Sequence, residues 1–497
     1  MGLTRGGFLR AAAGGGALLA LGAFAGCEPD PRIRASASPE SAGRTWAFRS
    51  RPDLTPPPVE VVRRTRATGE GYLLAAPKNG PGEVYPAQDG PMILDGEGQL
   101  VWFRPVPEEG QDAMDFRAQS YKGEPVLTWW QGAHGGWGDG EYLILDGSYR
   151  EVARVRAGNG LKGDHHEFLI SGRDTALFTV YRGVPMDLSP FGGPKKATVM
   201  DGVVQEVDIG TGEVLFEWHS LDHVGFDEST SRPKPDLKAP YDYFHINSVA
   251  EDADGNLFVG ARKTSAVYKV DRDSGQVIWR LGGKRSDFEM GEGATFAYQH
   301  DARRQADGTI TLFDNRGAEA GELSRGVRLG LDERAMRAEL VAEYTIPEAP
   351  FAIYQANVQD LPNGNVFVGW GSAPYLSEHD RDGALLFEAR FPETVESYRA
   401  YRSPWVGRPT DRPAVAGEVG PEDRVTLYAS WNGATEVDRW EVLAGPDPDG
   451  LEPLGSAPRK GFETAISFTT EEPFAAVRAK DRSGRTLGAS VAIRRER

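Results

Sequence analysis

Apolar and polar residues alternate in short runs over much of the chain, and one unit of this pattern recurs. In each copy an apolar strand is followed by an aspartate, a turn that usually contains glycine, and a second apolar strand. Such a turn between two alternating runs is typical of a β-hairpin. Copies of the unit occur at 92–106, 142–157, 204–220, 267–283, 327–345 and 375–391.

The spacing of these hairpins predicts the fold class. Their turn aspartates recur at intervals of roughly 50–60 residues, and further strand pairs such as 255–262 and 364–371 lie between them. Units of four strands at this period are typical of β-propeller blades. We therefore predict an all-β chain with a six-bladed β-propeller over 59–412, and a β-solenoid is the alternative arrangement. The aspartates are Asp95, Asp146, Asp208, Asp271, Asp332 and Asp380.

The pattern changes after Pro413. Apolar residues alternate with polar ones over 425–431 and again over 438–444, and two further apolar runs follow. This is typical of a β-sandwich of the fibronectin type III or immunoglobulin-like class. We predict such a module over 413–497. Histidine and acidic residues do not cluster in it, which favours a structural or docking role.

The N-terminus has the features of an export signal. Arg5 precedes an apolar and small-residue run over 11–24, which leads to Cys27, the single cysteine of the chain. We interpret 1–27 as a secretory signal peptide with a lipobox-like end and predict a lipid on Cys27, with an ordinary signal peptide as the alternative. Residues 28–58, rich in Ser, Pro and Arg, are predicted to form a flexible tether. The protein is expected outside the cytoplasm, anchored to a membrane by this lipid or otherwise secreted.

Overall charge narrows the classes of partner. The formal net charge is −17, and nucleic-acid binding requires a basic face. We therefore expect no nucleic-acid partner, and contact with a membrane only through the N-terminal lipid. An anionic substrate then has to be attracted by local Arg and Lys side chains, which is feasible because salt screens charges beyond about 10 Å.

The histidines supply the candidate chemistry. Of only eight in the chain, His166, His245 and His300 each open a similar segment in which a turn leads to an apolar strand. Equivalent positions of a repeat converge when the repeats surround an axis. With Arg262, which ends the strand after His245, these imidazoles would form a cationic pocket suited to a sulfuryl or phosphoryl group. Taken singly, each histidine is more typical of a structural hydrogen-bonding residue, and only the shared position in the repeats favours a common site. Strand alternation is expected to direct His165 to the opposite face from His166.

A metal site is the alternative to this pocket. Three imidazoles can bind Zn²⁺ and leave one position open for water. The fixed charge of Arg262 and the lack of a carboxylate in the same register argue against it. We therefore predict neither a metal nor another cofactor.

Several long stretches carry a specific resemblance. They read DYFHINSV, GARKTSAVYKVDRDSGQVIWRLGG, QHDARRQADGTITLFDNRG, NVQDLPNGNVFVGWGSAPYLSEHDRDG and SYRAYRSPWVGRP. In these stretches, over roughly 60–412, the chain resembles bacterial arylsulfate sulfotransferases, in particular their secreted bacterial and fungal branch. The C-terminal sandwich is also similar to that branch. Enteric members have an extra N-terminal domain and a disulfide, and this chain has neither feature.

The resemblance implies a reaction and a set of residues. It implies a six-bladed propeller that moves a sulfuryl group from an aryl sulfate donor to a phenolic acceptor without 3′-phosphoadenosine phosphosulfate, by a ping-pong mechanism through a sulfohistidine. His300 of QHDAR would be the nucleophile. Donor and acceptor identity stay open, because the loop over 220–243 matches no member. The supporting residues would be His245, His166 and Arg262, with Asn247, His165 and Arg303 binding the substrate.

Two other functional classes fit the same pattern of residues. One is a non-catalytic propeller lipoprotein that binds a sulfated or phenolic ligand, or a protein partner, in its channel. The other is a metal-dependent propeller hydrolase.

Overall fold

The described part of the molecule is built from β-strands. Within it the helices are two short 3-10 turns, η1 (Ser189–Phe191) and η2 (Ser220–Asp222), and none of its helices has the length and hydropathy needed to cross a bilayer. The predicted signal peptide, with Cys27, lies outside the described residues. The computed structural model describes residues 33–37, 45–82, 84–107, 110–317, 323–347 and 351–495.

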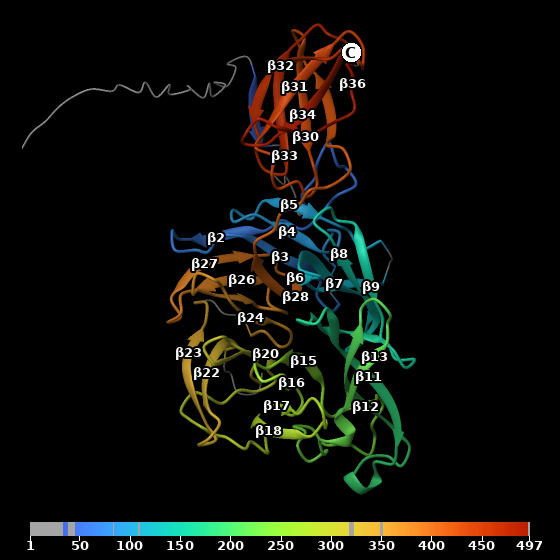
Figure 1. Cartoon of the computed structure of the whole chain (residues 1–497), viewed down its shortest axis with the longest axis vertical. Helices are drawn as coiled ribbons and strands as arrows, with labels where there is room; N and C mark the ends of the chain where they lie inside the picture. Colours follow the sequence, from blue (N-terminus) through green and yellow to red (C-terminus); the bar gives the residue numbers. More distant parts are fainter. Residues whose placement is uncertain are drawn as a thin grey trace, which may run out of the picture.

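Most strands between residues 60 and 403 form four-stranded units (Figure 1). The first unit has the order β28 (Val395–Ser403), β3 (Tyr72–Asn79), β4 (Met92–Leu94), β5 (Leu100–Phe103). The second comprises β6 (Asp112–Tyr121), β7 (Glu124–His134), β8 (Gly138–Leu145) and β9 (Glu151–Val155). The third comprises β10 (Gly163–Ile170), β11 (Thr175–Met186), β12 (Ala197–Asp208) and β13 (Val214–His219), with β14 (Tyr241–Asp242) beside β12. A β8–β10 pairing joins the second and third units into one sheet.

The remaining units are separate sheets. The fourth comprises β15 (Ile246–Glu251), β16 (Leu257–Ala261), β17 (Ala266–Val270) and β18 (Val277–Gly282). The fifth comprises β20 (His300–Arg304), β21 (Ile310–Asp314), β22 (Arg325–Asp332) and β23 (Arg337–Tyr344), with β19 (Glu289–Met290) beside β23. The sixth comprises β24 (Asn357–Asp360), β25 (Val366–Gly369), β26 (Tyr375–His379) and β27 (Leu385–Arg390), and β2 (Glu60–Arg64) pairs with β27.

The predicted hairpins are confirmed, each as the two outer strands of its unit. The turn aspartates explain why the sequence folds this way locally. Asp95 Oδ1 accepts the backbone N–H groups of Glu97 and Gln99, and Asp380 Oδ1 accepts those of Asp382 and Ala384. A carboxylate that accepts the amides of its own turn stabilises that turn against extended alternatives.

A buried cluster of charged side chains joins the first strands of the units. Arg399 on β28 is fully buried, with Nη1 2.9 Å from Glu167 Oε1 on β10 and 3.2 Å from Asp115 Oδ1 on β6. Its Nη2 also donates to the carbonyl of Asn247 on β15. On β24, the N–H of Val358 donates to Asp301 Oδ2. This ion cluster comprises Asp115, Arg117, Glu167, Asp301, Arg303 and Arg399.

The arginines of the ion cluster keep its central carboxylate ionised. Burial alone would raise the pKa of Glu167, but Arg303, Arg399 and Arg117 together hold this pKa down, at about 2. A buried charge is tolerated when it is paired and hydrogen-bonded. The strands that carry these residues are therefore held at fixed positions relative to one another.

The C-terminal strands form two sheets that enclose one apolar core, at one end of the molecule (Figure 1). One sheet has the order β1 (Arg34–Ala37), β33 (Glu463–Thr469), β30 (Arg424–Ser430), β29 (Ala414–Val419). The other has the order β32 (Glu452–Pro458), β31 (Arg439–Gly445), β34 (Phe474–Lys480), β35 (Thr486–Ala489), with β36 (Ile493–Arg494) beside β34.

The described residues of the predicted tether over 28–58, which are 33–37 and 45–58, differ from that prediction. Residues 34–37 form β1, which pairs with β33, and Ile33 and Ala35 pack on the C-terminal core. Further along, the N–H of Ser50 donates to Glu463 Oε2 at 2.6 Å. Apolar side chains at alternate positions give even a short segment one face to bury, and the free edge of β33 supplies its hydrogen bonds.

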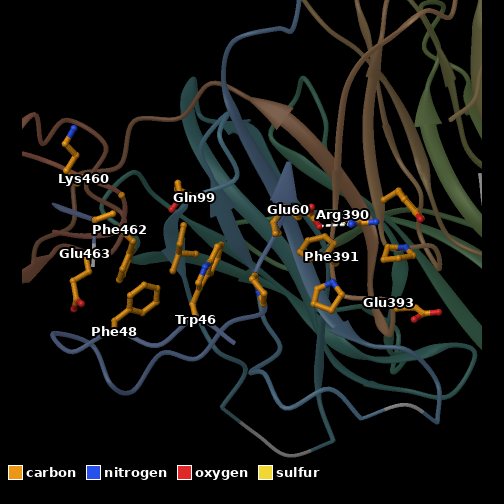
Figure 2. A pocket seen from close by; sticks show the side chains of 18 residues that line it. Trp46, Phe48, Glu60, Gln99, Arg390, Phe391, Glu393, Lys460, Phe462 and Glu463 are labelled. Carbon is orange, nitrogen blue, oxygen red and sulfur yellow. Dashed lines mark hydrogen bonds and ion pairs between the residues drawn. The ribbon is translucent and has the colours of Figure 1, made fainter. Parts of the chain in front are cut away.

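A cavity of about 950 Å³ lies between this N-terminal segment, the sixth unit and the C-terminal sheets (Figure 2). Aromatic rings of Trp46, Phe48, Phe391 and Phe462 line it. The Phe48 and Phe462 centroids are 4.4 Å apart. No histidine lines this cavity, so it is separate from the candidate chemistry.

Loss of Arg399 should destabilise the fold strongly. We expect Arg399→Met to lower the free energy of unfolding by about 3–5 kcal/mol, because it leaves buried carboxylates without a partner. Urea unfolding followed by tryptophan fluorescence measures this loss. Arg408→Ala, which removes an exposed ion pair to Glu436, is the control and should leave the unfolding midpoint nearly unchanged. Equal effects of the two substitutions would contradict a structural role for the ion cluster.

Candidate active site

The structure brings the three predicted histidines together. His166 lies on β10, His245 directly precedes β15, and His300 begins β20. The rings of His166 and His245 are 5.1 Å apart and nearly perpendicular. His300 is close enough to both, and to Arg262, for their charges to act on it. Residues from three separate units therefore meet at one place.

Each of these histidines has an oxygen partner on Nδ1. His166 Nδ1 lies 2.6 Å from Asp164 Oδ2, and His245 Nδ1 contacts Asp242 Oδ2. His300 Nδ1 instead lies 2.7 Å from the amide oxygen of Asn315. Two of the imidazoles thus face a carboxylate, and the third faces a neutral group.

Carboxylates therefore accompany two of the histidines, although they do not share one register. Asp164 and Asp242 precede their histidines by two and three residues, so the signal was present in the sequence. His245 has a φ of 55°, a left-handed conformation that turns the chain back on itself and lets its ring reach Asp242. Strand alternation alone does not predict such a turn.

Burial controls the charge of the site. Burial, assisted by the charge of Arg262, holds the pKa of His300 well below its usual value. Burial also lowers the pKa of His245, although Asp242 opposes the shift. Asp164 stays ionised despite burial, because His166 and His165 hold its pKa well below the usual range. His300 is consequently an uncharged imidazole with a basic nitrogen at neutral pH.

Arg262 and Asn247 lie beside the histidines. Arg262 Nη2 donates to the carbonyl of Ile353 at 3.0 Å, and its guanidinium lies over the ring of Tyr298 at 5.0 Å. Asn247 is fully buried, and its Nδ2 donates to the carbonyl of Gln299 at 2.7 Å. Within the described residues, Asn247 Oδ1 and Arg262 Nε have no hydrogen-bond partner. Both side chains therefore retain polar atoms for a ligand.

His165 does not point away from His166 as strand alternation predicted. The two rings stack with centroids 4.0 Å apart. The pairing of β10 with β11 shifts register between Gly163 and Phe168, and such an irregularity breaks the alternation of side chains. His165 also lies against the rings of Trp130 and Tyr398.

Arg303 lies apart from the histidines, in the ion cluster. It pairs with Glu167 and Asp301, and its Nη1 donates to the carbonyl of Val249 at 2.9 Å. Its donors thus serve the contacts between strands.

Two tyrosines that the sequence did not single out complete the wall of the site. Tyr181 lies against the rings of His166 and His245, and its hydroxyl donates to the carbonyl of Ile246 at 2.7 Å. The Tyr398 hydroxyl donates to the carbonyl of His166 at 3.1 Å. These rings give the site apolar faces suited to an aromatic substrate.

Asp164, His165 and His166 form a group whose ligand atoms lie within 4.8 Å of one another, close enough to hold a metal. The geometry fits poorly, because the two imidazole planes are only 28° apart. A metal ion lies in the plane of each imidazole that binds it, at a Zn–N distance of about 2.0–2.1 Å. Two stacked, nearly parallel rings offer no point that lies in both planes at that distance. Metal binding would require one ring to rotate.

The histidines should titrate very differently. We expect His300 to remain uncharged across the pH range in which an ordinary histidine titrates. His219 should stay protonated over that range, because its hydrogen bond to Asp201 raises its pKa to about 9. Nuclear magnetic resonance of histidine-labelled protein measures both, with His300→Gln and His219→Gln giving the assignments. Titration of His300 near its ordinary pKa would contradict the buried, uncharged imidazole.

Comparison with solved structures finds distant likenesses. The chain is similar to a protein of unknown function from Bacteroides caccae, with 15% identity, coverage of 67% of this chain and 100% of that one, and a TM-score of 0.40. It is also similar to a streptogramin B lyase, with 11% identity, coverage of 74% and 93%, and a TM-score of 0.35. A virginiamycin B lyase from Staphylococcus aureus has 10% identity, coverage of 73% and 97%, and a TM-score of 0.31. Likenesses this weak bear on neither mechanism nor substrate.

Comparison with curated proteins finds no match. Comparison with protein families is informative. The family described as Arylsulfotransferase (ASST) matches residues 117–392, more than half of the chain. The matched region includes the three histidines and Arg262. The chain therefore belongs to the arylsulfotransferase family.

Proposed function

We propose that the protein is an arylsulfate sulfotransferase that moves a sulfuryl group from an aryl sulfate to a phenol through a sulfohistidine at His300. Membership of the arylsulfotransferase family supports the class of reaction. The observation that carries the assignment of His300 is its neutral partner. Asn315 brings no negative charge to the ring, whereas the other two histidines face carboxylates.

The architecture we infer is a six-bladed propeller followed by a β-sandwich. Its support is that each of six four-stranded units contributes its first strand to the ion cluster or to a hydrogen bond with it. In such an arrangement the first strands surround the axis. The histidines and the ion cluster would then share the central channel.

The first half of the reaction forms one bond and breaks one. The Nε2 lone pair of His300 attacks the sulfur, so an N–S bond forms as the bond between sulfur and the aryl oxygen breaks. The departing oxide takes a proton from His245, because the contact with Asp242 opposes the effect of burial and stabilises the protonated ring. A charged His300 would have no lone pair to attack with.

The second half reverses these changes. The phenol gives its proton back to the same histidine, its oxygen attacks the sulfur, and the N–S bond breaks to restore neutral His300. Arg262, whose Nε has no partner within the described residues, is suited to hold the sulfuryl oxygens as charge shifts among them. Donors of this kind are typically worth about 2.7–4 kcal/mol each in the transition state.

A metal-dependent hydrolase is the second candidate function, favoured by the proximity of Asp164, His165 and His166. It differs from transfer in one measurable respect. Chelation would abolish its activity, whereas the proposed sulfuryl transfer needs no metal.

For the location of the protein we propose the cell envelope, with a lipid on Cys27 as anchor. The support is the apolar run before the single cysteine. In that location the donor and acceptor would be met outside the cytoplasm.

The decisive measurement is a covalent adduct. Incubation with 4-nitrophenyl sulfate should place a sulfuryl group on the peptide that contains His300, detected by mass spectrometry, and a second phenol should discharge it. His300→Ala should form no adduct. His245→Ala should slow transfer by roughly 10²–10⁴-fold, the usual contribution of a proton donor.

His223→Gln is the matched control, because His223 stacks on Trp218 outside the site, and it should retain full activity. A folded wild-type protein with neither turnover nor adduct would favour a non-catalytic binding role. Loss of turnover on chelation would favour the hydrolase.

A further inference from the structure

Asn315 is held in one orientation by the chain around it. It follows β21 and is fully buried. Its Nδ2 donates to the carbonyls of Ala352 and Gln355, at 2.9 and 3.1 Å. Backbone carbonyls only accept hydrogen bonds, so the NH₂ group must point at them. The amide oxygen is thereby directed at His300, and a flipped amide would lose both bonds.

This orientation fixes the proton on His300. The Asn315 oxygen, 2.7 Å from His300 Nδ1, can only accept, so Nδ1 must carry the hydrogen. The other ring nitrogen is independently identified as the bare one. The backbone N–H of Gln355 lies 3.2 Å from His300 Nε2 and donates to it. Two separate contacts thus require the same tautomer.

We propose that Asn315 is a positioning residue that makes Nε2 of His300 the attacking atom and places no negative charge beside the ring. This inference rests on the proposed function, since it concerns the nucleophile of that reaction. An aspartate at this position would also select the Nδ1–H tautomer. The negative charge of that aspartate would also raise the pKa of the His300 ring. A protonated ring has no lone pair with which to attack the sulfur.

The two contacts also serve the sulfuryl-bound state. When the N–S bond forms at Nε2, the ring becomes positively charged and Nδ1–H strengthens its bond to Asn315. The Gln355 N–H loses its acceptor at the same moment and lies beside the new sulfuryl group as a donor. Gln355 and Ala356 have φ values of 68° and 94°, unfavourable for residues with a side chain. The bond from Asn315 to Gln355 helps to hold this backbone.

The tautomer is measured directly on the full-length protein. Nitrogen-15 labelling of histidine distinguishes a protonated from a bare ring nitrogen, and His300→Gln assigns the signals. We expect Nδ1–H and bare Nε2 in the wild type, and a mixture of tautomers in Asn315→Ala. A wild-type ring protonated at Nε2 would overturn the inference. The wild-type tautomer is measured without enzyme turnover, and the measurement does not depend on whether the Asn315→Ala variant folds.

The charge effect is tested by the pH dependence of kcat/KM. Asn315→Asp should shift the acidic limb upward by about one pH unit or more, with about a tenfold loss per unit below it and recovery at higher pH. Asn357→Asp is the matched control. Asn357 is equally buried and bridges the backbone of Ala400, so this variant carries a buried carboxylate without touching His300. Its profile should keep the wild-type shape.

The outcomes separate the two proposals. An unshifted acidic limb in an active Asn315→Asp variant would overturn the role of Asn315, while turnover itself would still support the proposed function. The expected tautomer in a protein that forms no adduct with any aryl sulfate would overturn the proposed function and leave the control of the tautomer by Asn315 in place.

Discussion

The position of the site depends on the buried ion cluster. Glu167 and Asp301 directly follow His166 and His300 along the chain, so each paired carboxylate fixes the backbone of a neighbouring histidine. A shift of either strand would leave a charge unpaired away from water, which is strongly unfavourable. Stability and chemistry are therefore carried by the same strands, and the histidines need little rigidity of their own.

The sequence predicts the local features well. The hairpins are visible because each depends on residues within its own turn, and the shared register of the histidines follows from their places in those units. The partners of the histidines are less visible. Asp242 reaches its ring only through the positive φ of His245, and the stacking of His165 follows from a register shift. β1 was missed because its hydrogen-bonding partner, β33, lies near the other end of the chain.

The aromatic cavity and the histidine site lie in different parts of this molecule. The 950 Å³ cavity is lined by aromatic rings and lies apart from the histidines, whereas His300 is almost fully buried, with 1% of its surface exposed. The site is recognised by the charge state of its groups, with two imidazoles beside carboxylates and one beside an amide. Arg262 and His245 are its more exposed members.

The pairing of β1 with β33 has a consequence for assembly. β33 would otherwise be an edge strand, with a row of free N–H and C=O groups that can recruit a strand from another molecule. The β1 segment of the same chain covers this edge. It thereby protects the protein against self-association through β33.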